Sequence, residues 1–462
     1  MEKLYLDDTI AAISTPLGKS GIGIVRLSGK KAVSIADKIF IGSNGKRPSQ
    51  LATHRLYYGW IKNGKERIDE VLLNVMRAPR TYTKEDIVEI NCHSGIVVLR
   101  KILELVLSLG VRLSGRGEFT RRAYLAGRID LTQAEAILDV INSQTPQALN
   151  AALGQLEGRL SRKIGSLRRS LLEISTQLEA SIDFADQDIE PKSLEKILKK
   201  AKKASCQIKE LLDSADRGTI LREGISCVIC GRPNVGKSSL LNALLKKDRA
   251  IVTPLPGTTR DVLEETVDIS GIPLRLIDTA GIVEGSNLAE TEAVKRSRKA
   301  LKEADLILLV LDASRKLEAE DLKISRYISE RCAFVVLNKQ DLPQKIEADE
   351  LSRVSRGRKV IKVSALRGRG LKNLQREIAA YLWRGEAPSG DELLVTNIRH
   401  RQALKKAHLS LRRAVKAIKM SQGAEIIALY IKEAQSFLGE IIGKIHCEDI
   451  LERIFSQFCI GK

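Results

Sequence analysis

The stretch from Gly231 to Ser239, Gly-Arg-Pro-Asn-Val-Gly-Lys-Ser-Ser, constrains this chain more than any other. It fits G-x-x-x-x-G-K-[ST], a loop that wraps the phosphates of a nucleotide in backbone N–H groups. Gly231 and Gly236 let the backbone turn with no Cβ in the way of the phosphates. We expect Lys237 to reach the β- and γ-phosphates, and the Ser238 hydroxyl to bind Mg²⁺.

The sequence on either side of this loop supports a nucleotide site. Residues 226–230 form a short apolar, β-branched run that is typical of a buried strand, and residues 239–245 have helical propensity. A strand, a glycine loop and a helix are the required order, because the helix N-terminus adds its dipole to anion binding.

Two motifs that follow predict switch segments. Residues 250–261 are loop-like, and Thr259 is placed to complete the coordination of Mg²⁺ when a γ-phosphate is present. Strands at 264–269 and 274–277 form a hairpin that ends at Asp278, which can hold Mg²⁺ through water. Gly281 can then approach the γ-phosphate.

Two later motifs select the base. Buried strands are predicted at 306–311 and 334–337, and the second ends in Asn338-Lys-Gln-Asp341. Asp341 can accept two hydrogen bonds from guanine, whereas adenine would leave this carboxylate unpaired at a cost of about 1–3 kcal/mol. Ser364-Ala-Leu ends another strand and supplies an N–H to guanine O6. The sequence therefore predicts a Ras-like P-loop domain that binds GTP.

The residues expected to contact GTP come from these five motifs. They are Gly231, Asn234, Val235, Gly236, Lys237, Ser238, Ser239, Thr253, Pro254, Leu255, Pro256, Gly257, Thr258, Thr259, Asp278, Thr279, Ala280, Gly281, Asn338, Lys339, Asp341, Ser364 and Ala365.

The N-terminal part predicts a small α+β domain. Strands are expected at 21–29 and 87–93, followed by helices at 31–39 and 96–109. In the second strand Glu89, Asn91 and His93 share a polar face, and the alternate residues are buried. Glu89 and His93 are either functional or simply solvated.

Helices are predicted on both sides of the nucleotide domain. Thr132 resembles an N-cap, and the acidic segment 183–191 is expected to be a turn between antiparallel helices. Asn397 is expected to cap the first helix of a second helical region, which carries a basic stripe, Lys405, Arg412, Lys416 and Lys419. That stripe is either an RNA track or a solvated face.

Bulk properties narrow the class of protein. A chain of 462 residues predicts two to four domains, and a net charge of +20 favours an acidic partner such as RNA. There is no long apolar stretch and no signal peptide, so no membrane span is expected. Seven cysteines indicate free thiols in a reducing cytoplasm. Cys227 and Cys230 are expected in the core, on opposite faces of their strand.

The nucleotide motifs resemble the translation-factor-related small GTPases, in the subgroup with an Asn in the phosphate loop. That resemblance implies a K⁺ site formed by Asn234, Thr253, Leu255 and Thr258. Proline at 254 and 256 removes N–H groups, but the ion needs carbonyl oxygens, so the site should survive.

The whole chain resembles the MnmE (TrmE) family of tRNA modification GTPases. The resemblance rests on residues 21–29, 85–93, 117–123, 127–136 and 396–404, and on the terminal Cys-Ile-Gly-Lys. It implies a tetrahydrofolate-binding and dimerising domain (1–118), a helical domain in two parts (119–217 and 384–462), and a GTPase domain inserted between them (218–383).

The same resemblance implies the chemistry. With an FAD-dependent partner, MnmG, in a heterotetramer, such a homodimer adds an aminomethyl or carboxymethylaminomethyl group to C5 of the wobble uridine of tRNA. A 5-formyl or 5,10-methylene tetrahydrofolate donates the carbon. FAD is expected on the partner alone.

The family pattern also implies site residues. The folate contacts are Arg26, Glu89, Arg128 and Lys462, with Arg128 standing where relatives often have Lys. From the residues alone Glu284, Glu290 and Glu292 could each orient water, and the family pattern selects Glu290. Cys459 matches the tail cysteine, which either reacts or orders the tail.

Two rival functions remain open. A ribosome-assembly GTPase that binds rRNA would share the GTP motifs and a basic surface, but it would not need residues 1–120 or the tail. A GTP-switched binding protein without useful hydrolysis is the other.

Overall fold

The structure of the protein is a computed structural model. It describes residues 8–43, 45–183, 191–248, 264–278, 300–328, 333–383, 392–444 and 448–462. By compactness the chain divides into two units, Met1–Leu138 with Leu438–Lys462 and Asp139–Phe437. The first unit therefore combines the two ends of the chain.

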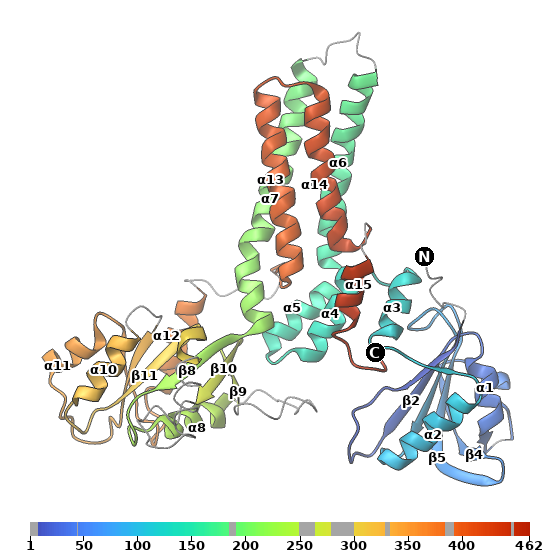
Figure 1. Ribbon diagram of the computed structural model, residues 1–462, viewed down its shortest axis with the longest axis horizontal. Helices are drawn as coiled ribbons and strands as arrows, with labels where there is room; N and C mark the ends of the chain where they lie inside the picture. Colours follow the sequence, from blue (N-terminus) through green and yellow to red (C-terminus); the bar gives the residue numbers. More distant parts are fainter. Residues whose placement is uncertain are drawn as a thin grey trace. The chain divides into compact units, whose positions relative to one another are not determined.

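The first unit is built on a seven-stranded sheet with the strand order β3-β4-β5-β6-β2-β1-β7 (Figure 1). The neighbouring strands are antiparallel except for β1 and β7, which are parallel. The strands are β1 (Ile10–Ile13), β2 (Gly23–Ser28), β3 (Phe40–Gly42), β4 (Arg55–Asn63), β5 (Glu66–Met76), β6 (Ile87–Cys92) and β7 (Arg112–Leu113). A 3₁₀ turn, η1, spans Pro48–Gln50.

Two helices cover one face of this sheet. Helices α1 (Ala32–Ile39) and α2 (Ile96–Ser108) bury their apolar sides against inward-facing strand residues such as Val88 and Ile90. The alternation in β6 is thus confirmed, since Val88, Ile90 and Cys92 are all buried.

The opposite face is covered at one end and exposed at the other. Helix α3 (Glu118–Leu125) buries Phe119 against Ile10 and Ala12 of β1. At the β3–β4–β5 end, Leu56, Tyr58 and Leu72 are exposed, so the face expected to be polar is largely apolar there. Polar residues lie farther along the same face, with Glu89 and Asn91 on β6 and Arg26 opposite Glu89 on β2.

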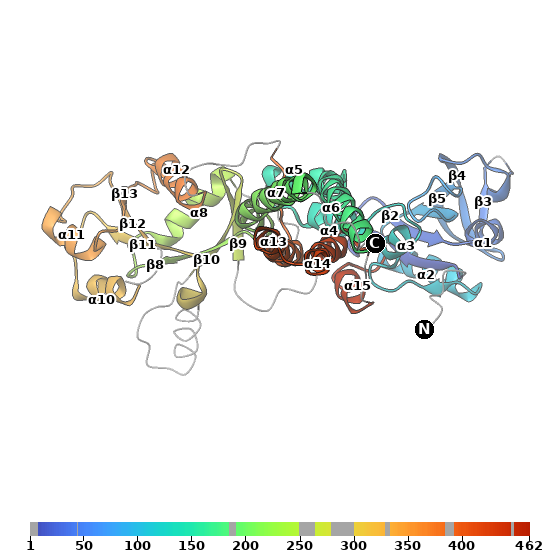
Figure 2. The same ribbon diagram turned by 90° about the horizontal axis from the view of Figure 1, so that it is seen from above.

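The helices flanking the nucleotide domain form one bundle, as expected for a discontinuous helical domain. Figure 1 shows α6, α7, α13 and α14 side by side, and Figure 2 shows them end-on. The bundle consists of α6 (Arg159–Asp183), α7 (Pro191–Glu223), α13 (Ile398–Lys419) and α14 (Ala424–Ile442). The other helices on either side of the nucleotide domain in sequence are α4 (Leu131–Asn142), α5 (Pro146–Leu156) and α15 (Glu448–Phe455).

Two caps in these helices were predicted, and one prediction was wrong. The Asn397 side chain accepts a hydrogen bond from the N–H of Arg399 at 2.8 Å, so it caps α13 as expected. Thr132 lies inside α4. The carboxylate of Asp130 accepts the N–H of Gln133 at 3.0 Å instead, which satisfies a first-turn donor. Asp130, two residues before Thr132, therefore takes the capping role, and the Thr132 hydroxyl donates to the same carboxylate oxygen at 2.7 Å. The predicted turn at 183–191 lies largely outside the described residues.

The nucleotide domain is a six-stranded sheet with the order β13-β12-β11-β8-β10-β9, in which β9 alone is antiparallel to its neighbour. This is the Ras-like arrangement that the motifs predicted. The elements are β8 (Ile225–Cys230), α8 (Lys237–Asp248), β9 (Glu264–Ile269), β10 (Ile272–Asp278), β11 (Leu306–Asp312), α10 (Ala319–Tyr327), β12 (Ala333–Asn338), α11 (Ala348–Ser355), β13 (Val360–Lys362) and α12 (Leu371–Leu382).

Helices cover both faces of that sheet, which leaves its strand ends as the place for a ligand. Cys227 packs in the core with α8 and α12, and Cys230 packs in the core with α10 and α11. The two cysteines therefore lie on opposite faces, as predicted. Burial raises the pKa of the Cys230 thiol to about 12, so it is an inert core residue.

No helix among the described ranges is long and apolar enough to cross a membrane.

Candidate functional site

The glycine loop joins β8 to α8 with backbone angles that its glycines make possible. Gly231 has φ +145° and Gly236 has φ +97°. A Cβ on Gly231 would lie 2.4 Å from the carbonyl oxygen of Val310, and one on Gly236 would lie 2.3 Å from Nδ2 of Asn338. Lys237 folds over the loop, with its ammonium donating to the carbonyl oxygens of Gly231 at 2.9 Å and Arg232 at 2.8 Å. The cation thus lies where phosphates would be cradled.

Asn338, at the end of β12, joins three loops of this site. Its side-chain amide donates to the carbonyl of Val235 at 3.0 Å, and its side-chain oxygen accepts the N–H of Ala365 at 3.0 Å. The residue is buried, with 2% of its surface exposed. Asn338 therefore holds the phosphate loop and the Ser364–Ala365 segment together.

Lys339 extends the same framework. Its ammonium lies 2.8 Å from the carbonyl oxygen of Asn234 and 2.6 Å from the carboxylate of Asp312, at the end of β11. Burial opposes ionisation of Asp312, but hydrogen bonds from Lys339 and Ser314 outweigh it and lower the pKa of this carboxyl. Asn234 itself has φ +63°, a left-handed conformation that Asn tolerates better than most residues.

Asp341 lies exposed beyond the end of β12, where a base would lie. The Ser364 hydroxyl donates to one of its oxygens, and this hydrogen bond lowers the pKa of the carboxyl. An ionised carboxylate held by a neighbouring loop is suited to accept N–H donors from guanine.

Several predicted nucleotide contacts fall on residues outside the part of the chain that the structure describes. The predicted switch-loop contacts from Thr253 to Thr259 lie outside the described residues, as do Thr279, Ala280 and Gly281. The same holds for Glu284, Glu290 and Glu292. For Asp278 the backbone is described, and it pairs with Ile229 at the strand end next to the glycine loop.

A second cluster of predicted residues lies in the first unit. Arg26 of β2 and Glu89 of β6 stand opposite each other in the sheet and form an ion pair at 2.8 Å. Their side chains are 18% and 20% exposed. A guanidinium N–H of Arg26 also donates to the carbonyl of Gly461 at 3.4 Å. The last residues of the chain are thereby brought to the middle of the N-terminal sheet.

The tail is fixed there by its own backbone. Ile460 forms a bridge with Arg116, and the carbonyl of Lys462 accepts the N–H of Phe119 at 3.1 Å. Gly461 has φ +93°, and a Cβ on it would lie 2.4 Å from the carbonyl oxygen of Ile13. No larger residue fits this contact. Cys459 is a free, exposed thiol beside it.

Two aromatic rings complete this cluster. The guanidinium of Arg26 lies 5.7 Å from the centre of the Phe119 ring, and that of Arg128 lies 4.8 Å from the centre of the Tyr82 ring. Burial raises the pKa of Tyr82, although its hydrogen bond with Thr120 and the positive charges of Arg128 and Arg26 oppose this. All four predicted folate residues therefore belong to one region of the first unit.

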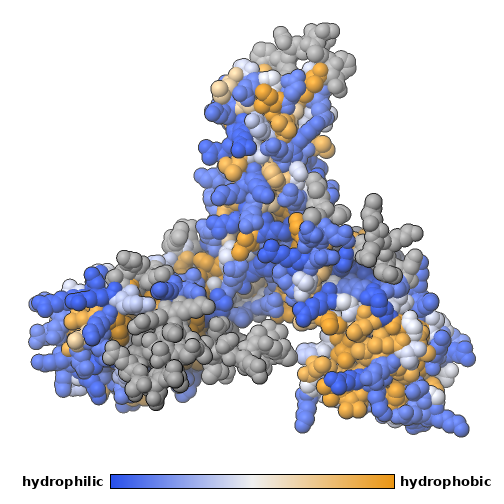
Figure 3. Space-filling view, in the orientation of Figure 1, coloured by the Kyte–Doolittle hydropathy of each residue, from blue (hydrophilic) through white to orange (hydrophobic). Residues whose placement is uncertain are grey.

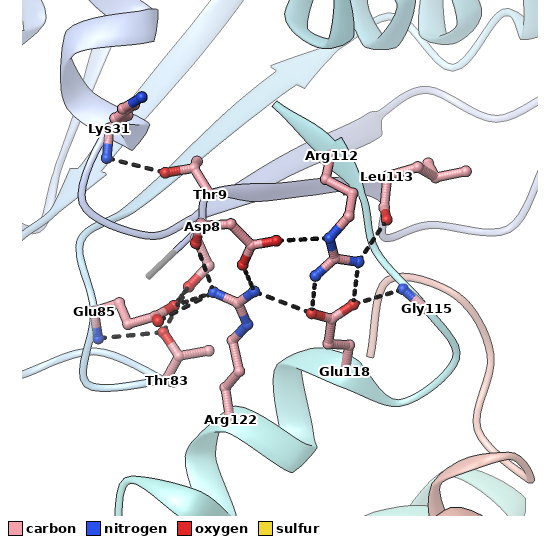
Figure 4. A network of polar contacts seen from close by, with 11 residues as sticks. Asp8, Thr9, Lys31, Thr83, Glu85, Arg112, Leu113, Gly115, Glu118 and Arg122 are labelled. Atoms are coloured by element: carbon pink, nitrogen blue, oxygen red, sulfur yellow. Dashed lines mark hydrogen bonds and ion pairs between the residues drawn. The ribbon is translucent and has the colours of Figure 1, made fainter. Parts of the chain in front are cut away.

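A buried ionic network beside this cluster was not predicted. Figure 4 shows the guanidinium of Arg122 between the carboxylates of Asp8, Glu85 and Glu118, and Arg112 bridges Asp8 and Glu118. Arg122 is 3% exposed. Burial acts to raise the pKa of Glu118, but hydrogen bonds from Arg112, the Gly115 N–H and Arg122 outweigh it and bring the value to about 2.

The position of this network explains its role. It holds α3 onto the N-terminal sheet, and α3 in turn carries Phe119 and receives the tail. The signal in the sequence was the charged run at 117–123, which identifies the family but does not by itself reveal that Arg122 is buried. The structure describes no group of His, Cys, Asp and Glu side chains that could hold a metal.

Comparisons with known proteins find relatives that match along nearly the whole chain. A family model described as the GTP-binding protein TrmE N-terminus matches residues 9–128, and one described as the MnmE helical domain matches residues 131–459. The curated tRNA modification GTPase MnmE of Alkaliphilus oremlandii is 48% identical over 461 residues, which cover 99% of this chain and 100% of that protein. The protein of the same name from Bacillus subtilis is 45% identical over 458 residues, 98% of this chain and 100% of that one.

Among solved structures, Aquifex aeolicus Era bound to GDP and AlF₄⁻ is 29% identical. The match covers 40% of this chain and 66% of that chain, with a TM-score of 0.29.

Proposed function

The chain belongs to the MnmE family of tRNA modification GTPases, and we propose that it is a K⁺-dependent GTP hydrolase that works with an FAD-dependent partner, MnmG. Together they add an aminomethyl or carboxymethylaminomethyl group to C5 of the wobble uridine of tRNA. A tetrahydrofolate derivative provides the one-carbon unit. The odd number of cysteines supports the cytoplasm as the site of action.

The glycine loop supports the GTP part of this proposal. Its backbone conformation leaves no room for a Cβ at Gly236, and Lys237 supplies a cation at the phosphates. Ser238 and Thr259 are the proposed Mg²⁺ ligands, and a bound Mg²⁺ would offset charge on the β- and γ-phosphates. Asp341 is the proposed guanine contact.

Asn234 supports the K⁺ site. Its side chain is exposed, and its backbone is held by Lys339, so its amide oxygen is available to a cation at the phosphate loop. Thr253, Leu255 and Thr258 would add oxygen ligands. A monovalent cation there would stabilise the negative charge that develops between the β- and γ-phosphates. Glu290 would orient the attacking water.

The cluster around Arg26 supports the folate part. Tetrahydrofolate combines a flat heterocycle that carries N–H donors with an anionic tail. The Glu89 carboxylate can accept from such donors, the rings of Tyr82 and Phe119 can contact a flat group, and Arg128 and Lys462 can pair with carboxylates. The chain therefore has acceptors, rings and cations of the kinds this ligand needs.

The exposed apolar face of the N-terminal sheet supports a homodimer. Leu56 is 59% exposed, and Tyr58 and Leu72 are 45% and 40% exposed. Tyr58 and Leu72 are cross-strand partners, and the next partner across is Asn91, beside Glu89. Figure 3 shows this unit from its other side, on which α2 lies, where hydrophobic side chains also reach the surface. A second copy that covers the face with Leu56, Tyr58 and Leu72 would lie next to the proposed folate site.

The contact between the tail and Arg26 is the observation that carries the proposal. A GTPase that merely assembled ribosomes would have no reason to hold its last residues, by a backbone fit that requires Gly461, against an Arg–Glu pair of the N-terminal sheet. Cys459 would then lie beside the folate and could react or order the tail.

The test is mass spectrometry of tRNA wobble nucleosides from cells with and without this chain. We expect the aminomethyl-type uridines to disappear on deletion and to return with the intact gene. A normal nucleoside profile together with a defect in ribosomal subunits would favour the assembly GTPase instead.

A further inference from the structure

A basic groove runs between α7 and α13 of the helical bundle. It has a volume of about 650 Å³. Five cations line it, one from α7 and four from α13: Lys202, Arg412, Arg413, Lys416 and Lys419. Leu409 and Val415 supply its apolar surface, and no acidic residue of the described chain lines it. Lys405, which the sequence placed in the same stripe, does not line the groove.

The shape of the groove follows from how the two helices pack. Ala201 and Ala204 of α7 and Ala407 and Ala414 of α13 are buried. Small side chains let the helices approach, so the long Lys and Arg side chains stand along the rim. The Ser205 hydroxyl and the His408 ring meet across the helices at 3.3 Å and hold this arrangement.

The groove cations differ in ion pairing from other cations of the bundle, which form ion pairs with carboxylates. Lys200 pairs with Glu173 at 2.7 Å, Arg401 with Asp216 at 2.8 Å, and Lys432 of α14 with Glu179 at 2.7 Å. The five groove cations are exposed, and the described residues provide no ion pair for any of them. Unpaired like charges on one surface repel each other, so this surface is suited to an anionic ligand that neutralises several charges at once.

The spacing fits a chain of phosphates. Arg412, Lys416 and Lys419 recur at four and three residues and therefore share one side of α13. At about 1.5 Å per residue they cover about 10 Å, a length over which a nucleic acid duplex carries roughly six phosphate charges. A single small anion would need fewer cations.

We infer that this groove binds the phosphodiester backbone of tRNA. The inference rests on the tRNA modification proposed above and assigns a place on the chain to the RNA. Contacts to phosphates carry no base information, so the groove would position different tRNAs equally well. The choice of the wobble uridine would then be made elsewhere.

The experiment compares two triple variants of the full chain. The groove variant is Arg412→Gln with Lys416→Gln and Lys419→Gln. The control is Lys200→Gln with Arg401→Gln and Lys432→Gln, which loses the same charge from cations that are already paired. Binding of a tRNA transcript with uridine at the wobble position is measured by fluorescence anisotropy over a range of salt concentrations.

We expect the groove variant to bind the transcript about tenfold or more weaker, and the slope of log K against log salt to fall by about three, near one per lost phosphate contact. The control should change the slope by less than about one. GTP turnover without tRNA should be unchanged in both, which shows that each variant is folded.

Three outcomes would overturn the inference. Equal losses in both variants would mean that net charge alone matters, and unchanged binding by the groove variant would remove the groove from tRNA binding. If the groove variant lost affinity for phosphatidylglycerol vesicles and kept its affinity for tRNA, the anion would be a lipid. In each case the wobble-nucleoside measurement judges the proposed function separately.

Discussion

Asn338 and Val235 are 103 residues apart in sequence, yet the side-chain amide of Asn338 donates a hydrogen bond to the carbonyl of Val235 at 3.0 Å. The same side chain receives the N–H of Ala365. The base-selecting motif and the phosphate loop are therefore parts of one hydrogen-bonded framework. A nucleotide that binds at one end encounters a site already ordered at the other.

Replacing Asn338 by Ala should weaken GTP binding by about 10- to 100-fold. The change leaves two buried backbone groups unpaired, at about 1–3 kcal/mol each, and 1.4 kcal/mol is about a factor of ten in affinity. Titration with a fluorescent GTP analogue measures the loss. Asn373→Ala is the control, because Asn373 is exposed on α12 and bonds to Arg376 alone. Equal affinity in both variants would contradict the framework role.

Replacing Glu118 by Gln should destabilise the first unit by about 2 kcal/mol at neutral pH, after allowance for solvent screening. The pKa of Glu118 is about 2 in the folded protein and 4.5 in the reference state. A carboxyl with a lowered pKa contributes stability above about pH 4.5, and this contribution is lost as the pH falls toward 2. Urea denaturation of both proteins at pH 7 and at pH 3 measures it.

The difference between wild type and Glu118→Gln should therefore shrink between pH 7 and pH 3. Glu66→Gln is the matched control, since Glu66 forms an exposed ion pair with Lys101 and should change stability by less than about 1 kcal/mol at either pH. A pH-independent loss in Glu118→Gln would indicate a packing effect instead.

The sequence predicted the nucleotide domain well because its motifs are local. Each one is a loop at a strand end, and the strand, loop and helix that carry Gly231 to Ser239 are adjacent in sequence. For the N-terminal unit the α+β class, strands β2 and β6 and helices α1 and α2 were predicted, but the rest of the sheet was not. Strands β1, β3, β4, β5 and β7 were missed, since antiparallel pairing and register depend on partners far along the chain.

The same dependence on partners far along the chain explains why the sequence did not locate the candidate folate site. Nothing local in the sequence shows that Gly461 lies against Arg26, which is 435 residues away. The family resemblance named these residues without placing them. The buried Arg122 network was missed because burial of a charged residue depends on distant partners, here Asp8 and Glu85, which are 114 and 37 residues away. The four domain limits and the roles of the site residues stay predictions.

Replacing Glu89 by Gln should weaken binding of 5-formyltetrahydrofolate by about tenfold or more, because a charged acceptor becomes a neutral amide that also leaves Arg26 unpaired. Isothermal titration calorimetry measures the affinity. GTP turnover should not change, since Glu89 lies in the first unit and the glycine loop in the second. Asp37→Asn serves as the control on the same unit. Retained folate affinity in Glu89→Gln would remove this residue from the proposed site.

Replacing Leu56 and Leu72 by Glu should convert a homodimer into monomers. Both side chains lie on the exposed apolar face, and burying two carboxylates without partners in an interface is strongly unfavourable. Light scattering during gel filtration gives the mass. The control replaces Val97 by Glu, because Val97 is 64% exposed on α2, the helix that covers the other face. If the wild type is a monomer at micromolar concentration, or if every variant stays dimeric, this face is not a homodimer interface.

Replacing Glu290 by Ala should lower GTP turnover by about 100-fold and leave GTP affinity intact, because a residue that orients water acts in the transition state and not in nucleotide binding. Turnover in K⁺ and in Na⁺ is measured in the same assay. Asn234→Ala should reduce the rate in K⁺ to the rate in Na⁺, since its amide oxygen is proposed as a ligand of the cation. Glu292→Ala is the matched control for an acid in the same segment. Unchanged turnover in Glu290→Ala would mean that another acid orients the attacking water. Equal rates of the wild type in K⁺ and in Na⁺ would exclude the K⁺ site. Neither result would affect the proposed GTP site, which rests on the geometry of the glycine loop.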